Sequence, residues 1–200
     1  NPIDTKVYHP MDQGMARELL GLPSGKRLLL FGALNVTDKR KGIDYLIEAL
    51  RRMEKQDVEL VVFGQVKDDI RGLFPVPIHS MGYLSDESKI VALYNAVDMF
   101  ITSSLEENLP NTIMESMACG TPCVGFEIGG IPEMIDHRVN GYVANYKDAG
   151  DLANGIQWVL EHEDRLALSD ACVKKVQENY TEEVVAKQYT ALYEKLLKGE

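Results

Sequence analysis

Two kinds of hydrophobic pattern alternate along the chain. Ile43, Leu46, Ile47 and Leu50 follow the three- and four-residue spacing of one helical face, and similar blocks recur downstream. Between these blocks lie short, continuous apolar runs, which are typical of strands buried on both faces. The patterns predict strands over 27–31, 58–63, 77–81, 99–102, 124–126 and 141–143, and helices over 42–54, 86–95, 110–119, 149–162, 164–180 and 181–198.

Local signals support the expected element ends. Ser85 is expected to cap the helix over 86–95, while Pro110 stands in the first turn of the next helix and Gly120 ends it. Turn-forming residues before the first strand predict an irregular lead-in. Strands that alternate with helices form a parallel sheet covered on both faces. The predicted fold is an α/β domain with a doubly wound parallel sheet of about six strands and extra C-terminal helices.

Composition narrows the classes of function. With 200 residues and 45% hydrophobic content, the chain can bury one sizeable core. Its formal net charge of −10, without a long basic run, argues against a nucleic-acid groove or contact with an anionic membrane surface. No apolar run reaches the length of a membrane span, and no signal peptide is recognised. The opening Asn1-Pro2-Ile3-Asp4, without an initiator Met, is typical of the middle of a longer protein.

The sequence shows no recognisable pattern for a disulfide framework, a metal site or a dinucleotide cofactor. Cys119, Cys123 and Cys172 are too few for a disulfide framework. Cys119 and Cys123 lie in an apolar segment, so we expect them to be buried thiols in a reducing compartment. The C-x-x-x-C spacing of the first two lacks matching ligands, and the histidines are scattered, so no metal site is predicted. No G-x-G-x-x-G motif follows a predicted strand, so no dinucleotide cofactor is expected.

The loop after the first predicted strand, residues 32–42, lies where open parallel sheets bind ligands. Its first two residues, Gly32 and Ala33, are small and allow a ligand to approach the backbone. Three consecutive cations, residues 39–41, then precede a predicted helix N-terminus, where the helix dipole disfavours positive charge. An anionic ligand explains this arrangement, and the alternative is a solvated run of charge on a surface loop.

Two carboxylates, Glu107 and Glu115, stand eight positions apart across a predicted loop-to-helix junction. The helix over 110–119 is apolar nearly all round, so the charge of Glu115 needs a partner or a ligand. The alternative to a ligand-binding role is helix capping for Glu107 and an ordinary exposed position on the helix for Glu115. A glycosidase-like acid pair is a competing interpretation, but it requires both acids to flank one bond. The paired glycines within 125–133 either border the ligand or form only a tight turn.

Taken together, these motifs resemble the C-terminal, donor-binding domain of the group 1 glycosyltransferases (glycosyltransferase family 4), which are retaining enzymes of the GT-B fold. Residues 1–8 are similar to the family's interdomain crossing, and residues 82–86 and 93–100 are similar to its middle signature. Residues 107–122 match its paired acids, spaced E-x7-E, and the segment that follows them. The resemblance covers nearly the whole chain. It implies a crossing segment over 1–26 and a Rossmann-like, nucleotide-sugar-binding domain over 27–200.

The resemblance also implies roles for individual residues. Glu115 would hold the ribose hydroxyls of a nucleotide sugar, and Glu107, the candidate catalytic residue, would face the transferred sugar. Lys41 matches the family's diphosphate-binding Lys, whereas Ala33 occupies the usual Arg position, so Arg40 is the candidate replacement. The further expected donor contacts are Gly32, Asn108, Leu109, Asn111 and Thr112, together with Tyr83 and Leu84, near which the base is expected.

We therefore interpret the chain as the donor-binding half of a retaining hexosyltransferase that uses a nucleotide-diphosphate sugar in polysaccharide or glycoconjugate biosynthesis. No metal or other cofactor is expected. The expected partners are the nucleotide sugar and an N-terminal domain of the same polypeptide, without which the chain would be inactive. The expected location is the cytoplasm, with the whole enzyme either free or peripheral on the inner face of the membrane. The alternatives are a GT-B-fold sugar-nucleotide epimerase and a non-catalytic nucleotide-binding domain.

Overall fold

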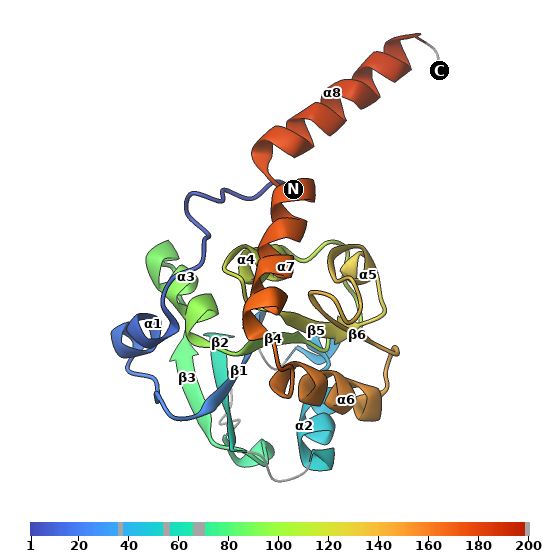
Figure 1. Cartoon of the computed structure of the whole chain (residues 1–200). Coiled ribbons are helices and arrows are strands. Elements are labelled where there is room, and N and C mark those ends of the chain that lie inside the picture. The colour runs from blue at the N-terminus through green and yellow to red at the C-terminus, as the bar shows by residue number, and fades with distance from the viewer. Residues whose placement is uncertain (36–37, 54–56, 66–70, 199–200) are drawn as a thin grey trace.

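The computed structural model describes residues 1–35, 38–53, 57–65 and 71–198, and its centre is a six-stranded sheet (Figure 1). The described strand pairs are all parallel, which confirms the predicted doubly wound α/β fold. In spatial order the strands are β3 (Ile78–Gly82), β2 (Val58–Gln65), β1 (Arg27–Asn35), β4 (Met99–Thr102), β5 (Cys123–Phe126) and β6 (Gly141–Ala144). The strand order therefore reverses between β1 and β4, and sheets of this kind bind ligands at such a switch point.

The described helices pack around the sheet (Figure 1), and their bounds are α1 (Gln13–Leu20), α2 (Ile43–Arg52), α3 (Glu87–Ala96), α4 (Asn111–Ala118), α5 (Ile131–Met134), α6 (Ala149–Leu160), α7 (Arg165–Asn179) and α8 (Glu182–Lys198), with 3-10 turns η1 (Lys39–Lys41) and η2 (Arg71–Leu73). Side chains of β1 alternate between two hydrophobic cores: Leu29 and Phe31 contribute to one, and Leu28 and Leu30 to the other. The first core is covered mainly by α2 and α6, and the second by α1, α3, α4, α5 and α7.

The lead-in before β1 contains the helix α1, so the prediction of an irregular segment there is wrong. The carboxylate of Asp12 caps the helix start, and Gly21 ends it in the left-handed conformation. The buried residues of α1 are Ala16 and Arg17, and a buried arginine hides the apolar period that would have revealed the helix.

Strand β1 is longer than predicted and runs to Asn35. Gly32 and Ala33 therefore belong to the strand rather than to the loop after it. The glycine is required by packing, because a Cβ at Gly32 would overlap the ring of Phe63 on the neighbouring strand. Residues 36–37 of the predicted ligand loop lie outside the described residues.

Two helix ends also differ from the prediction. Asp86, not Ser85, caps α3, because its carboxylate accepts a hydrogen bond from the N–H of Ser88 at 3.0 Å. Helix α2 ends at Arg52, and the predicted end at Glu54 lies outside the described residues. Both differences are small. The short helix α5 is absent from the predicted helices, and the remaining strands and helices after the lead-in follow the predicted order.

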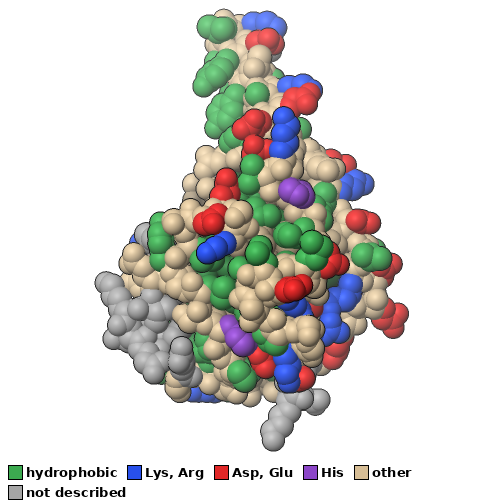
Figure 2. Space-filling view, turned by 90° about the vertical axis from the view of Figure 1, so that its left-hand side faces the viewer, with side chains coloured by type: hydrophobic (Ala, Val, Ile, Leu, Met, Phe, Trp, Pro, Cys, Tyr) green, Lys and Arg blue, Asp and Glu red, His purple; other side chains and the backbone are tan. Residues whose placement is uncertain are grey.

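Helix α8 projects away from the body of the domain, and none of its residues is buried (Figure 1). The N-terminal end of the chain lies at its base, since the N–H of Ile3 donates to the carbonyl of Tyr180 at 2.8 Å. Hydrophobic side chains gather along one side of the projecting helix (Figure 2). They include the exposed residues Tyr189, Leu192, Tyr193, Leu196 and Leu197.

Candidate functional site

The carboxyl edge of the sheet joins two segments that are far apart in the sequence, the turn η1 after β1 and the segment after β4. η1 lies against the segment after β4, since the N–H of Leu105 donates to the carbonyl of Arg40 at 2.7 Å. The hydroxyl of Ser103 donates to the carbonyl of Lys41 at 2.9 Å. Between η1 and α2, Gly42 has a φ of +63°, and a Cβ there would overlap the carbonyl oxygen of Ser103. This close backbone contact fixes where the side chain of Lys41 begins.

Lys41, which the resemblance assigns to the diphosphate, and Glu107, which it assigns to the transferred sugar, form an ion pair between Nζ and Oε1. The Glu107 side chain is only 14% exposed, and that of Lys41 is 32% exposed. The pair lies near the switch point, beside the segment that leads into α4. The sheet therefore brings together two of the predicted site residues, with their charges directed at one another.

The glycine pair after β5 holds the segment that carries Glu107. The N–H of Gly130 donates to the carbonyl of Asn108 at 2.5 Å. Gly129 has a φ of +54°, and a Cβ there would overlap the carbonyl oxygen of Glu107. Only glycine allows both the conformation and the contact. The sequence left open whether this turn borders a ligand or is merely tight, and the structure places it against the backbone of Glu107 and Asn108.

Arg40 behaves differently from its neighbour Lys41. Its guanidinium pairs with Asp38 on the same turn, with Nη2 and Oδ2 2.7 Å apart, and its side chain is 67% exposed. Hydrogen bonds from Arg40 lower the pKa of Asp38 to about 2. Arg40 is therefore held on its own turn, whereas Lys41 reaches Glu107. Of the candidate cations in this turn, Lys41 is the one that the fold directs into the site.

Glu115 lies half-buried on α4, and the hydroxyl of Tyr94 donates a hydrogen bond to its Oε2 at 2.8 Å. Burial raises the pKa of Glu115, whereas the hydrogen bond from Tyr94 acts in the opposite direction. The partner that the sequence required for this buried charge is thus partly supplied by α3. Tyr94 was not among the predicted site residues, although a tyrosine on the apolar side of a helix needs a partner for its hydroxyl.

The remaining predicted residues border the same edge in different ways. Tyr83 is 61% exposed after β3, while the next residue, Leu84, packs against the second core. Leu109 also packs against that core, just before Pro110, which occupies the N-cap position of α4. The first N–H groups of a helix have no partner within it, so Asn111 and Thr112 present amides at this end.

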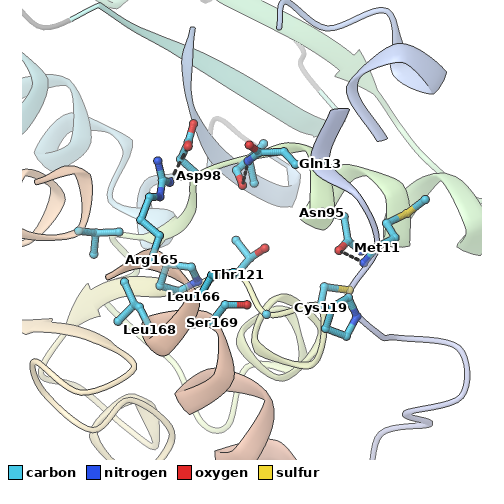
Figure 3. Close-up of a pocket in the computed structure, with 15 residues that line it drawn as sticks. Met11, Gln13, Asn95, Asp98, Cys119, Thr121, Arg165, Leu166, Leu168 and Ser169 are labelled. Atoms are coloured by element: carbon cyan, nitrogen blue, oxygen red, sulfur yellow. Dashed lines mark hydrogen bonds and ion pairs between the residues drawn. The ribbon is translucent and has the colours of Figure 1, made fainter. Parts of the chain in front are cut away.

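A second charged cluster lies at the opposite, amino edge of the sheet, beside a cavity of about 440 Å³ (Figure 3). Buried Asp98, directly before β4, accepts hydrogen bonds from Arg17 at 3.1 Å, Arg165 at 2.5 Å and the N–H of Leu28 at 2.7 Å. Arg27 completes the cluster at 3.5 Å. The carboxylate of Asp98 is therefore fully supplied with donors by the protein itself, and its removal would leave Arg17 buried without its charge partner.

The described ranges contain no disulfide, no metal-ligand cluster and no helix suited to spanning a membrane. The three cysteines are buried and not disulfide-bonded, which confirms the predicted burial of Cys119 and Cys123, and burial raises the pKa of each of these two thiols to about 12. Among residues 1–35, 38–53, 57–65 and 71–198, no group of three or more His, Cys, Asp or Glu side chains is placed to hold a metal ion. Within the same ranges, no helix combines the length and apolar character needed to cross a membrane.

Comparison with known proteins agrees with this architecture. A family model described as "Glycosyl transferases group 1" matches residues 25–162, and the chain belongs to this family. It is 25% identical to N-acetyl-alpha-D-glucosaminyl L-malate synthase of Bacillus anthracis, over 100% of this chain and 54% of the relative. It is 27% identical to D-inositol 3-phosphate glycosyltransferase of Mycolicibacterium smegmatis, over 80% of this chain and 39% of the relative. The chain thus spans about half the length of the curated relatives it matches.

Solved structures share the fold. Anabaena Alr3699/HepE in complex with UDP and glucose matches with a TM-score of 0.80 and 20% identity, over 97% of this chain and 55% of that chain. The C-terminal domain of a glycosyl transferase group 1 family protein (LpcC) from Francisella tularensis matches with a TM-score of 0.75 and 21% identity, over 90% of this chain and 99% of that chain. The predicted Rossmann-like fold of a GT-B glycosyltransferase domain is therefore confirmed.

Proposed function

We propose that this chain is the donor-binding half of a retaining glycosyltransferase, which transfers a hexose from a nucleotide-diphosphate sugar to an acceptor in polysaccharide or glycoconjugate biosynthesis. The observation that carries the proposal is the ion pair of Lys41 and Glu107 beside the start of α4. A cation for phosphate and an acid for sugar hydroxyls meet there, in a chain that belongs to a glycosyltransferase family.

Each part of the donor has a proposed contact. Lys41 and the amides of Asn111 and Thr112 bind the diphosphate, with the positive end of the α4 dipole behind them. These groups stabilise the charge that develops on the diphosphate as the bond to the sugar breaks. Glu107 accepts hydrogen bonds from the sugar, and Glu115 accepts them from the ribose. No metal is needed in this scheme, because the cation and the helix terminus supply the positive charge.

Other residues of the same edge complete the proposed site. The base lies near Tyr83 and Leu84, and the exposed ring of Tyr83 offers it a stacking surface. The small residue Ala33, two residues before the end of β1, leaves room for the diphosphate, whereas the space beside Gly32 is filled by the ring of Phe63. The backbone around Asn108 and Leu109, fixed by the turn after β5, lines the sugar position.

The acceptor side of the reaction is assigned to an N-terminal domain of the same polypeptide, with residues 1–26 as the crossing segment. The curated relatives are about twice as long as the matched region, in keeping with such a domain. The exposed apolar side chains of α8 and a neighbouring cavity of about 400 Å³, lined partly by Leu109 and Tyr180, offer it a contact surface. The isolated chain is expected to bind the donor without transferring sugar, and the whole enzyme is assigned to the cytoplasm.

A thermal-denaturation screen against UDP, GDP, ADP and their sugars tests the proposal. A ligand at 100 times its dissociation constant adds about 2.7 kcal/mol to the free energy of unfolding. UDP is the first choice, because the structurally similar Anabaena protein was solved with UDP and with UDP-glucose. If none of these compounds raises the melting temperature, the proposal is wrong.

Incubation of the full-length protein with a nucleotide sugar distinguishes a glycosyltransferase from the two alternative functions. A sugar-nucleotide epimerase would release a product from the nucleotide sugar without any acceptor. A non-catalytic binding domain would bind the nucleotide, but the full-length protein would transfer no sugar. Both outcomes are read from chromatography of the nucleotide sugar after incubation with full-length protein.

A further inference from the structure

We propose that Tyr94 is a positioning residue for nucleotide binding, whose hydroxyl keeps the Glu115 carboxylate ionised and turned so that its second oxygen is presented to the ligand. This inference rests on the proposed function, in which Glu115 binds the ribose hydroxyls. It adds a residue from α3, whose hydroxyl is buried behind the site and need not touch the nucleotide.

The hydroxyl of Tyr94 is fixed in place before any ligand arrives. The side chain is 1% exposed, and its ring packs edge-on against Phe63 and Phe100, with centroids 6.2 Å and 6.0 Å away. Its backbone carbonyl accepts a hydrogen bond from the hydroxyl of Thr121 at 2.7 Å. A ring held on two sides cannot swing its hydroxyl away from Glu115.

The contact leaves one carboxylate oxygen for the ligand. Tyr94 bonds Oε2 of Glu115 at 2.8 Å, and no other side chain within the described ranges donates a hydrogen bond to Glu115. A buried hydroxyl without a partner is costly, so Tyr94 is bound to this acceptor. Oε1 is then the atom that can accept a hydrogen bond from a sugar hydroxyl.

The electrostatic surroundings of Glu115 make this hydrogen bond important. The titratable groups that face it are Glu87 and Tyr94 from α3, Tyr8 from the lead-in and Cys119 from the C-terminal cap of α4. Burial first, and then Glu87, raise the pKa of Glu115, while Tyr94 lowers it. The pKa of Tyr94 is itself well above its ordinary value because of burial, so its hydroxyl remains a donor. None of these groups is a cation.

The test compares Tyr94→Phe with a matched control, Tyr142→Phe. Tyr142 is 5% exposed and donates a hydrogen bond to a carboxylate, that of Asp151, at the same 2.8 Å, but it lies on β6. The dissociation constant of UDP is measured by calorimetry at pH 8 and pH 5 for both variants and the natural protein. Because the terminal phosphate of UDP itself titrates near about pH 6, each variant is compared with the natural protein at the same pH.

Removal of the Tyr94 hydroxyl makes the ionised form of Glu115 harder to maintain at low pH. The loss of UDP affinity in Tyr94→Phe should therefore be about tenfold greater at pH 5 than at pH 8, on the scale of a hydrogen bond to a charged group. In Tyr142→Phe the loss should be equally small at both values. In a Glu115→Gln background, Tyr94→Phe should lose its pH dependence. Equal losses at pH 5 and pH 8 in Tyr94→Phe would overturn the inference.

A titration without ligand separates this inference from the proposed function. Carbon-detected NMR of the Glu115 carboxyl should give a higher pKa in Tyr94→Phe than in the natural protein. If UDP binds and this pKa does not move, the inference is wrong and the proposed function stands. If UDP never binds, the proposed function and the role of Tyr94 in binding both fail. Should Tyr94→Phe not fold, 3-fluorotyrosine at position 94, a stronger donor, must lower the carboxyl pKa, and an unchanged value overturns the inference.

Discussion

The two edges of the sheet both carry buried charge, but they arrange it in different ways. At the amino edge, Asp98 receives donors from three arginines and a backbone N–H, so the protein matches the charge by itself. At the carboxyl edge, Lys41 and Glu107 form an ion pair with one another, and Glu115 accepts a hydrogen bond from a single side-chain donor, the hydroxyl of Tyr94. A buried charge with a complete set of partners indicates a structural role, whereas an incomplete set leaves atoms for a ligand.

A cavity lies at the opposite edge of the sheet from the proposed site. The cavity of about 440 Å³ lies beside Asp98, on the side away from the strand ends where doubly wound sheets bind ligands (Figure 3). The carboxyl-edge site is defined instead by backbone contacts at Gly42, Gly129 and Gly130, which bring separate loops together. The predictions below test whether the two edges really divide stability and binding between them.

Asp98→Ala should give the largest effect, and the effect should be on folding. Removal of the carboxylate leaves the buried Arg17 without its charge partner, which costs roughly 3–5 kcal/mol of unfolding free energy. Urea denaturation measures this loss. The control is Asp57→Ala, which breaks an exposed pair with Lys26 and should leave the midpoint almost unchanged. A stable Asp98→Ala protein with impaired UDP binding would reverse the comparison of the two edges.

Glu115→Ala should give the opposite pattern. Nucleotide binding should weaken by roughly 1.5–3 kcal/mol, because a hydrogen bond from the ribose to a charged acceptor is lost. The fold should survive the change. Calorimetry with UDP measures the affinity, and Glu161→Ala, a change at an exposed acid after α6, is the control. An unfolded variant, or unchanged affinity, would assign Glu115 a structural role instead.

Lys41→Met should weaken binding of a nucleoside diphosphate by about 1.5 kcal/mol, the lower end for a charged hydrogen bond, because water partly screens this side chain. Binding of the nucleoside without phosphates should not change. Arg40→Met is the matched control, since that guanidinium is held by Asp38. Equal losses in the two variants would mean that the charge of the whole turn matters, and not the direction of Lys41.

Glu107→Gln should distinguish the proposed role of Glu107, at the sugar, from that of Glu115, at the nucleotide. In the full-length enzyme, turnover should fall strongly, while the affinity for nucleoside diphosphate should stay within about 1 kcal/mol, the scale of one neutral hydrogen bond. Glu106→Gln, a change at the exposed neighbouring residue, is the control. The isolated chain should transfer no sugar in any variant. Full turnover in Glu107→Gln would remove this residue from the catalytic site.

Chelation of divalent metal ions should have the smallest effect on nucleotide affinity. The dissociation constant of UDP, measured by calorimetry, should be the same with and without EDTA, because Lys41 and the α4 amides supply the positive charge for the diphosphate. Loss of binding in EDTA would show that a divalent metal bridges the diphosphate, and the proposed division of roles at the carboxyl edge would then have to change.

Much of the fold could be predicted from the sequence, because strands of a sheet that is covered on both faces appear as continuous apolar runs. The apolar runs that predicted β1, β2 and β4 are the runs that the two cores bury. The spacing of Glu107 and Glu115 placed one acid before α4 and the other within it, as the structure has them. Helix α1 escaped prediction because its buried face contains Arg17, whose charge is matched only in the folded domain.

The pairing of side chains was decided by the tertiary structure alone. Lys41 and Arg40 are adjacent cations in the sequence, and only the contact of Gly42 with Ser103 directs the first toward Glu107. The sequence likewise required a partner for Glu115 but could not choose Tyr94, because that contact depends on how α3 and α4 pack against the same face of the sheet. Periodicity records which residues are buried, whereas the identity of their neighbours follows from three-dimensional packing.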